Sequence, residues 1–124
     1  ATTHVTAIRN ALANLVVDSL DVGGAGFLIF ETAASAEVAT LRFASTAFGA
    51  ASAGVATAAA IVRDSSATGG IIAKFRMTDG AGADAGWKGS VTATGGGGDI
   101  TMPNVTVAAG EPVEVSSLTY TASV

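Results

Sequence analysis

Apolar side chains recur at helical spacing in the first segment of the chain. Four large apolar residues are separated by three, four and three positions and therefore share one face of an α-helix: Val5, Ile8, Leu12 and Leu15. The opposite face carries polar side chains: Arg9, Asn10 and Asn14. The hydroxyl of Thr2 or Thr3 is placed to cap the first turn, and the glycine-rich residues 23–26 follow the pattern's end. We therefore predict one amphipathic helix over residues 1–19.

Beyond residue 20 the pattern is typical of short β-strands. Residues 27–30 (Phe-Leu-Ile-Phe) are apolar on both faces, as expected of a central strand. Residues 71–78 alternate most clearly, with apolar side chains at the odd positions and polar side chains at 74, 76 and 78. Pro103 cannot donate a ladder hydrogen bond, so residues 100–107 are expected to form an edge strand or to contain a bulge. The other strands are expected in four ranges: 38–43, 55–62, 87–94 and 113–121.

The order of these elements defines the expected fold class. A helix followed by a series of strands lacks the βαβ alternation that builds parallel sheets. Short strands at near-regular spacing are typical of antiparallel sandwiches. We predict an all-β fold, an antiparallel β-sandwich of jelly-roll type with one short N-terminal α-helix. The amphipathic helix takes residues 1–19 and the β-sandwich domain takes residues 20–124.

Four consecutive glycines at residues 95–98 suggest a phosphate-binding loop at first sight. Such a loop continues into Lys-Ser or Lys-Thr and a helix. Here Asp99 and a Val/Thr-rich segment follow, and strand sequence also precedes the glycines. We interpret residues 95–98 as a flexible connection between two β-strands, with room for the close approach of a neighbouring subunit.

Composition removes several classes of function. The 124 residues contain no cysteine, which excludes disulfides, thiol catalysis and thiolate metal sites. The net charge is −4 and the six basic residues are scattered, so we expect no nucleic-acid partner. Residues 43–62 are uncharged, but small side chains dominate there, and we expect a soluble protein without a membrane partner.

Catalytic chemistry has little support in the sequence. His4 is the single histidine and lies at the start of the predicted helix, where no triad would hold it. The ten acidic residues fall mostly at turns and strand ends, where solvation explains them. We therefore expect no enzyme, no cofactor and no catalytic residue.

Two features remain as candidate binding sites. The segment 79–84 places Asp79 and Asp84 around small residues, a spacing that can wrap calcium but that hairpin loops also use for turn chemistry. We favour the turn and expect no metal. Trp87 and Tyr120 could form a sugar-stacking platform, although aromatic residues far apart in sequence more often anchor a core or an interface.

The amphipathic N-terminal helix has two possible roles. It could pack on its own β-domain, as surface helices usually do. It could also dock on a neighbouring subunit. The second role defines the candidate interface residues together with the two aromatics: Val5, Ile8, Leu12, Leu15, Trp87 and Tyr120.

Three segments of the chain resemble small virion proteins of tailed bacteriophages: residues 6–18, 90–100 and 115–122. Among such proteins, a small β-sandwich without a catalytic motif resembles a capsid cement or decoration protein. The resemblance implies a non-enzymatic role in which many copies bridge and stabilise the major capsid protein. It implies a homo-oligomer, a dimer or trimer, on the capsid exterior, made in the bacterial host cytoplasm.

Alternatives to the cement role stay open at this point. One is a tail or baseplate component of the virion. Another is a carbohydrate- or receptor-binding module whose site contains Trp87, Tyr120 and the loop 79–84. An enzyme is the third and most distant alternative.

Overall fold

The computed structural model describes residues 4–115 and 117–122 of the chain as a mainly β fold with one α-helix. The helix α1 (Thr6–Asp18) continues into a short 3-10 helix, η1 (Ser19–Asp21). Nine strands follow within the described residues: β1 (Phe27–Glu31), β2 (Glu37–Arg42), β3 (Val55–Thr57), β4 (Gly70–Ile71), β5 (Lys74–Thr78), β6 (Gly89–Ala93), β7 (Ile100–Met102), β8 (Thr106–Val107) and β9 (Thr119–Thr121). None of the described helices is long and apolar enough to span a membrane.

The largest element is a five-stranded sheet with the order β2-β1-β5-β6-β7. The prediction of a central strand at residues 27–30 is confirmed, because β1 pairs with β2 on one side and β5 on the other. Cross-strand partners share a face of the sheet. Leu28 lies opposite Leu41 and Met77, and all three are buried. These side chains form the core face of the sheet.

The other face of the same sheet is largely polar. Ile29 lies between Thr40 of β2 and Arg76 of β5, and Glu31 lies opposite Lys74. Antiparallel sheets commonly cover one face and expose the other to water. The alternation predicted for residues 74–78 follows from this arrangement, because Phe75 is buried while Lys74 and Arg76 are half-buried on the open face.

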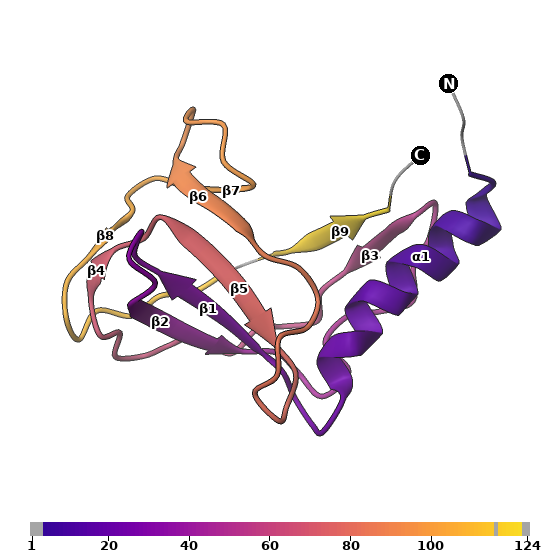
Figure 1. Ribbon diagram of the computed structural model, residues 1–124, viewed down its shortest axis with the longest axis horizontal. Helices are drawn as coiled ribbons and strands as arrows, with labels where there is room; N and C mark the ends of the chain where they lie inside the picture. The colour runs from indigo at the N-terminus through magenta and orange to yellow at the C-terminus, as the bar shows by residue number, and fades with distance from the viewer. Residues whose placement is uncertain (1–3, 116, 123–124) are drawn as a thin grey trace.

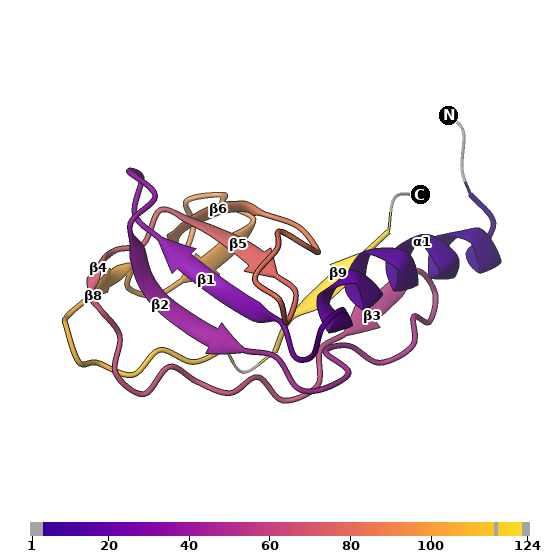
Figure 2. The same ribbon diagram turned by 60° about the horizontal axis from the view of Figure 1, so that its bottom comes forward.

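Two short antiparallel ribbons complete the fold: β3–β9 and β4–β8. The β4–β8 ribbon lies at one end of the sheet, and the β3–β9 ribbon extends from the other end (Figures 1 and 2). Helix α1 lies alongside the β3–β9 ribbon and contacts both of its strands. Together α1 and this ribbon form an arm that projects from the sheet.

The expectation of an entirely antiparallel sheet is wrong for one pair, because β6 and β7 run parallel. Only residues 94–99 join them, whereas parallel strands usually need a crossover of about a dozen residues or more. The chain doubles back beside β6: Gly98 donates a hydrogen bond to Oγ1 of Thr92, and Asp99 accepts one from the Ser90 N–H. It then turns again to enter β7.

The glycines permit this reversal in two ways. Gly95 and Gly97 have φ angles of 89° and 80°, in the left-handed region that favours glycine. Gly96 and Gly98 pack against Thr92, where an added Cβ would lie 2.7 Å and 2.9 Å from its Oγ1. The connection between strands is confirmed. Two of the glycines approach Thr92 within the chain, and the approach of a neighbouring subunit to this loop stays a prediction.

Several strand boundaries differ from the predictions. The strand expected at residues 71–78 is split, because Ile72 donates its N–H to Val105 while Ala73 donates to Glu31 of β1. This break reverses the alternation, so that Ile71 is exposed and Ile72 is buried. The ranges 55–62 and 113–121 contain strands of three residues each. Alanine-rich sequence favours strands weakly, and residue 58 onward pairs with several segments instead of one.

Candidate interaction surface on the N-terminal helix

Helix α1 begins without a side-chain cap. Val5 occupies the N-cap position with extended backbone, and no side chain there accepts a hydrogen bond from the first turn. The cap predicted from Thr2 or Thr3 lies outside the described residues, and the helix starts later than that prediction requires. The first turn also contains no acidic residue. The positive end of the helix is therefore not neutralised by the helix itself.

The polar face of α1 attaches the helix to the rest of the molecule. Asn10 Oδ1 accepts a hydrogen bond of 2.8 Å from the Gly54 N–H, and Asn14 Oδ1 accepts one of 2.9 Å from the Ala51 N–H. The guanidinium group of Arg9 lies against Gly54, where an added Cβ would come within 2.8 Å of it. Residues 51–54 form a tight turn before β3, and its outward N–H groups find their acceptors on the helix.

Small apolar side chains complete this contact. Ala13 is fully buried and Val17 is 1% exposed, on the same side of the helix as the two asparagines. Leu20 of η1 is also fully buried. The side of α1 that sequence periodicity marks as polar is thus the side that packs on the domain. The helix therefore packs on its own domain, as in the first of the two predicted roles, but it does so through its small and polar side chains and not through its large apolar face.

The opposite side of α1 leaves its large apolar side chains exposed. We call these four residues the α1 stripe, and their exposed fractions are 68%, 49%, 37% and 72% for Val5, Ile8, Leu12 and Leu15 respectively. Full burial of one such side chain contributes about 1.5–3 kcal/mol. Exposed apolar side chains that share one helix face can serve as a protein–protein contact. Their role as interface residues stays a prediction, and their position leaves them available for it.

The structure brings Trp87 and Tyr120 together although they are 33 positions apart in sequence. Their ring centroids are 4.8 Å apart, and Trp87 also contacts Phe48 at 5.7 Å. Phe48 in turn lies 5.9 Å from the buried Phe43. The four rings form a row that runs from the core to the half-buried pair of Trp87 and Tyr120. Spacing in sequence contained no signal for this contact, because it depends on where β9 pairs.

The loop 79–84 uses its acidic residues separately. Asp79 is buried, and its Oδ1 accepts hydrogen bonds from the Ala81 and Ala83 N–H groups. Asp84 is exposed and receives a 3.4 Å contact from Nη1 of Arg76. An aspartate that accepts backbone N–H groups two and four residues later is a turn-forming device. Across residues 4–115 and 117–122, no group of three or more acidic or histidine side chains is placed to hold a metal ion.

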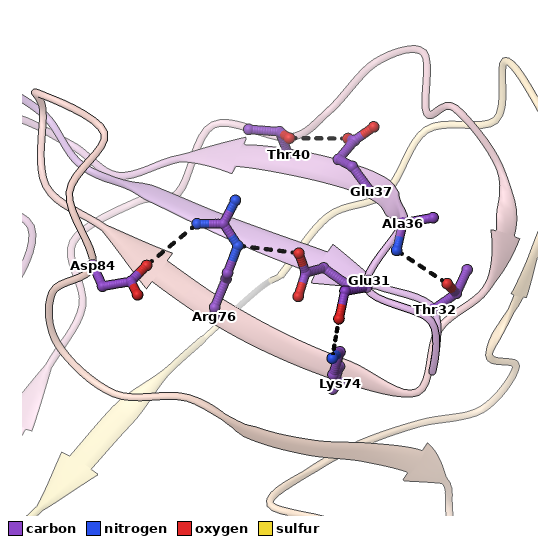
Figure 3. Close-up of polar contacts among 9 residues, drawn as sticks. Glu31, Thr32, Ala36, Glu37, Thr40, Lys74, Arg76 and Asp84 are labelled. Atoms are coloured by element: carbon purple, nitrogen blue, oxygen red, sulfur yellow. Dashed lines mark hydrogen bonds and ion pairs between the residues drawn. The ribbon is translucent and has the colours of Figure 1, made fainter.

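A polar groove lies on the open face of the sheet beside this loop. It has a volume of about 700 Å³, and its lining includes Glu31, Lys74, Arg76 and Lys88. Nε of Arg76 donates to Glu31 at 3.1 Å, and Figure 3 shows its guanidinium group between Glu31 and Asp84. The lysine at position 74 donates to the hydroxyl of Ser35. The closeness of Lys74 and Arg76 in sequence was the one available signal for this groove.

The single histidine of the chain belongs neither to the α1 stripe nor to the groove on the open face of the sheet. His4 is exposed in the residues that precede α1.

No protein-family model, curated protein or solved structure matches the chain. The molecule is a mainly β protein whose helix is attached by polar contacts and presents an apolar stripe outward.

Proposed function

We propose that this protein is a non-enzymatic structural component of a tailed-bacteriophage virion, a capsid cement or decoration protein that bridges major capsid subunits on the capsid exterior. The observation that supports this role best is the exposed α1 stripe. An apolar helix face that is not used for folding is suited to a protein–protein contact. The resemblance of residues 6–18 to phage virion proteins includes this same helix.

The energetics suit a protein that acts in many copies. The four side chains of the α1 stripe are already partly covered, so their burial contributes less than the roughly 1.5–3 kcal/mol of a fully exposed side chain. Such a contact is modest for a single site. On a lattice, each further contact becomes intramolecular once the first has formed, and avidity multiplies the affinity.

The way in which the strands form layers is part of the same proposal. We infer a β-sandwich of jelly-roll type, in which the β4–β8 ribbon and the loops outside the five-stranded sheet serve as the second layer. In support, Ala67, Val107 and Val113 belong to the same hydrophobic cluster as Phe30 and Phe75 of the five-stranded sheet.

A carbohydrate- or receptor-binding module is the second candidate function. The observation in its favour is that Trp87 contacts Tyr120 and also borders a small cavity with Arg76 and Lys88. An aromatic face can stack on a sugar ring, and the charged groups beside it, which include Asp84, can bond the sugar's hydroxyl groups. The half-burial of both rings and their contact with Phe48 favour the alternative role as anchors of the core.

Location on the particle tests the proposal. Cryo-electron microscopy of the intact virion is expected to show density for this protein on the head, over joints between capsid subunits. Density confined to the tail or baseplate would replace the cement role with a tail role. Absence from the particle would refute both.

Binding experiments separate the second candidate. Purified protein is expected to sediment with heads that lack it, and Trp87→Phe, which keeps an aromatic anchor, is expected to leave this unchanged. Binding to a glycan array that is lost in Trp87→Phe while the variant still folds would favour the carbohydrate role instead.

A further inference from the structure

The α1 stripe has the spacing of a coiled-coil seam. Its members follow one another at intervals of three, four and three residues, which are the a and d positions of a heptad. A stripe limited to these two positions is narrower than the face with which a helix covers a domain core. The natural occupant of such a seam is another helix.

The flanks of the stripe favour a second copy of α1 as that helix. On one flank lie three exposed residues at heptad spacing: His4, Ala11 and Asp18. The small side chain of Ala11 in the middle allows a second helix to approach closely, and Asp18 lies in the last turn of α1. An antiparallel second copy would bring its Asp18 close to the N-terminal end of α1, just before the first turn. That turn has neither a side-chain cap nor an acidic residue of its own, and a carboxylate near it is favourable.

We propose that two copies of this chain pair through their α1 stripes, with the helices antiparallel about a two-fold axis near Ala11. In this alignment Val5 faces Leu15 of the second copy, and Ile8 faces Leu12 of the second copy. The contact is self-complementary, as a two-fold interface requires. The inference rests on the proposed function only in assigning the α1 stripe to a protein–protein contact. It makes that contact the one between two copies of the chain, so that a dimer would meet two capsid subunits through other surfaces and bridge them.

The placement of the helix also favours the antiparallel arrangement. The C-terminal end of α1 joins the sheet, and its N-terminal end points away from it (Figures 1 and 2). Antiparallel helices therefore place the two sheets at opposite ends of the pair. Parallel helices would place both sheets at the same end, where they compete for space.

Mass in solution tests whether the pair forms. Light scattering after size exclusion is expected to give twice the chain mass of 12.0 kDa for the unmodified protein. Leu15→Glu is expected to reduce this to the monomer mass, because it places a charge in the seam. Ala7→Glu is the matched control, since it adds the same charge at an exposed helix position outside the α1 stripe, and it is expected to remain a dimer. A monomeric unmodified protein, or a Leu15→Glu variant that stays dimeric, would overturn the proposal.

Single cysteines test the direction of pairing, and the chain contains no other cysteine to interfere. Ala11→Cys is expected to form a disulfide-linked dimer on mild oxidation. Leu15→Cys is expected to stay unlinked, because the two copies of position 15 would be ten residues apart along the axis, about 15 Å, beyond the roughly 7 Å limit for a disulfide. Crosslinking of Leu15→Cys but not of Ala11→Cys would overturn the antiparallel arrangement.

Failure of the pairing and failure of the proposed function give different results. A monomer that still binds phage heads refutes the pairing alone. A dimer with the expected crosslinks that does not bind heads supports the pairing and refutes the cement role.

Discussion

Replacing the asparagines of α1 should destabilise this protein more than replacing its most exposed leucine. Asn14→Ala leaves the Ala51 N–H without its acceptor, and Asn10→Ala does the same to the Gly54 N–H. An unsatisfied, partly buried donor costs about 1–3 kcal/mol. Alanine recovers up to about 0.7 kcal/mol through its higher helix propensity. We therefore expect each variant to lower the free energy of unfolding by roughly 0.5–2 kcal/mol.

The leucine provides the contrasting case. Leu15 is 72% exposed in a single chain, so at concentrations where the protein is monomeric Leu15→Ala removes little buried surface, and we expect a change within about 0.5 kcal/mol. A leucine packed in a core would lose about 2–5 kcal/mol on the same substitution. The difference between these two values distinguishes the two ways in which α1 could pack.

Urea unfolding followed by fluorescence provides the measurement. Trp87 is the single tryptophan and is half-buried against Tyr120, so its emission reports the folded state. Asn14→Asp retains an acceptor oxygen and serves as the conservative control, with most of the stability kept. Each variant is measured at several protein concentrations, because loss of a dimer contact depends on concentration and loss of a contact within the chain does not.

One result would refute the reasoning. If Leu15→Ala loses about 2 kcal/mol or more at every concentration while Asn14→Ala is neutral, the apolar face packs on the domain and the assigned orientation of α1 is wrong.

Three further predictions concern the sheet and its loops. Glu31→Ala should lower the free energy of unfolding in urea by about 1.5–3 kcal/mol, because it leaves Arg76 without its shorter contact. Asp84→Asn removes the contact at the exposed end of Arg76 and should change the free energy of unfolding by less than about 1 kcal/mol. Equal effects of the two variants would contradict the conclusion that Arg76–Glu31 is the stronger pair. Gly96→Ala should be destabilising, because its Cβ would meet Thr92. Gly49→Ala is the control: its Cβ would meet nothing nearer than 3.9 Å, and the variant should be neutral or slightly stabilising. The reverse order of the two thermal midpoints would contradict the path described for residues 94–99. Asp79→Ala should lower the thermal midpoint equally with and without calcium, because Asp79 serves the turn; a calcium-dependent rise in the midpoint of the unmodified protein would show a metal site instead.

Local patterns predicted the elements that depend on neighbouring residues. The helix, the central position of residues 27–30 and the interruption at Pro103 follow from periodicity, apolar runs and the missing N–H of proline. The alternation of Phe75 and Met77 with Lys74 and Arg76 was also predictable, since β5 pairs along its length with β1.

Pairings between distant segments were not predictable in the same way. The acceptors on α1 bond to N–H groups that are 37 and 44 residues away, so nothing local indicates that the polar face packs inward. Two asparagines in a helix are the one hint, because asparagine is a poor helix former and its presence suggests a tertiary role. The parallel pairing of β6 with β7 likewise depends on a chain reversal that glycines permit but do not require.

Hydrophobic periodicity acts over a few residues, and it is enough to specify a mainly β protein with an amphipathic N-terminal helix. Which side of that helix faces the domain depends instead on contacts between distant segments. The turn at residues 51–54 presents N–H groups that need acceptors, and Asn10 and Asn14 satisfy them, while alanine and valine beside them allow close contact. The α1 stripe is exposed as a consequence, and the same spacing that predicts the helix defines a surface for another molecule.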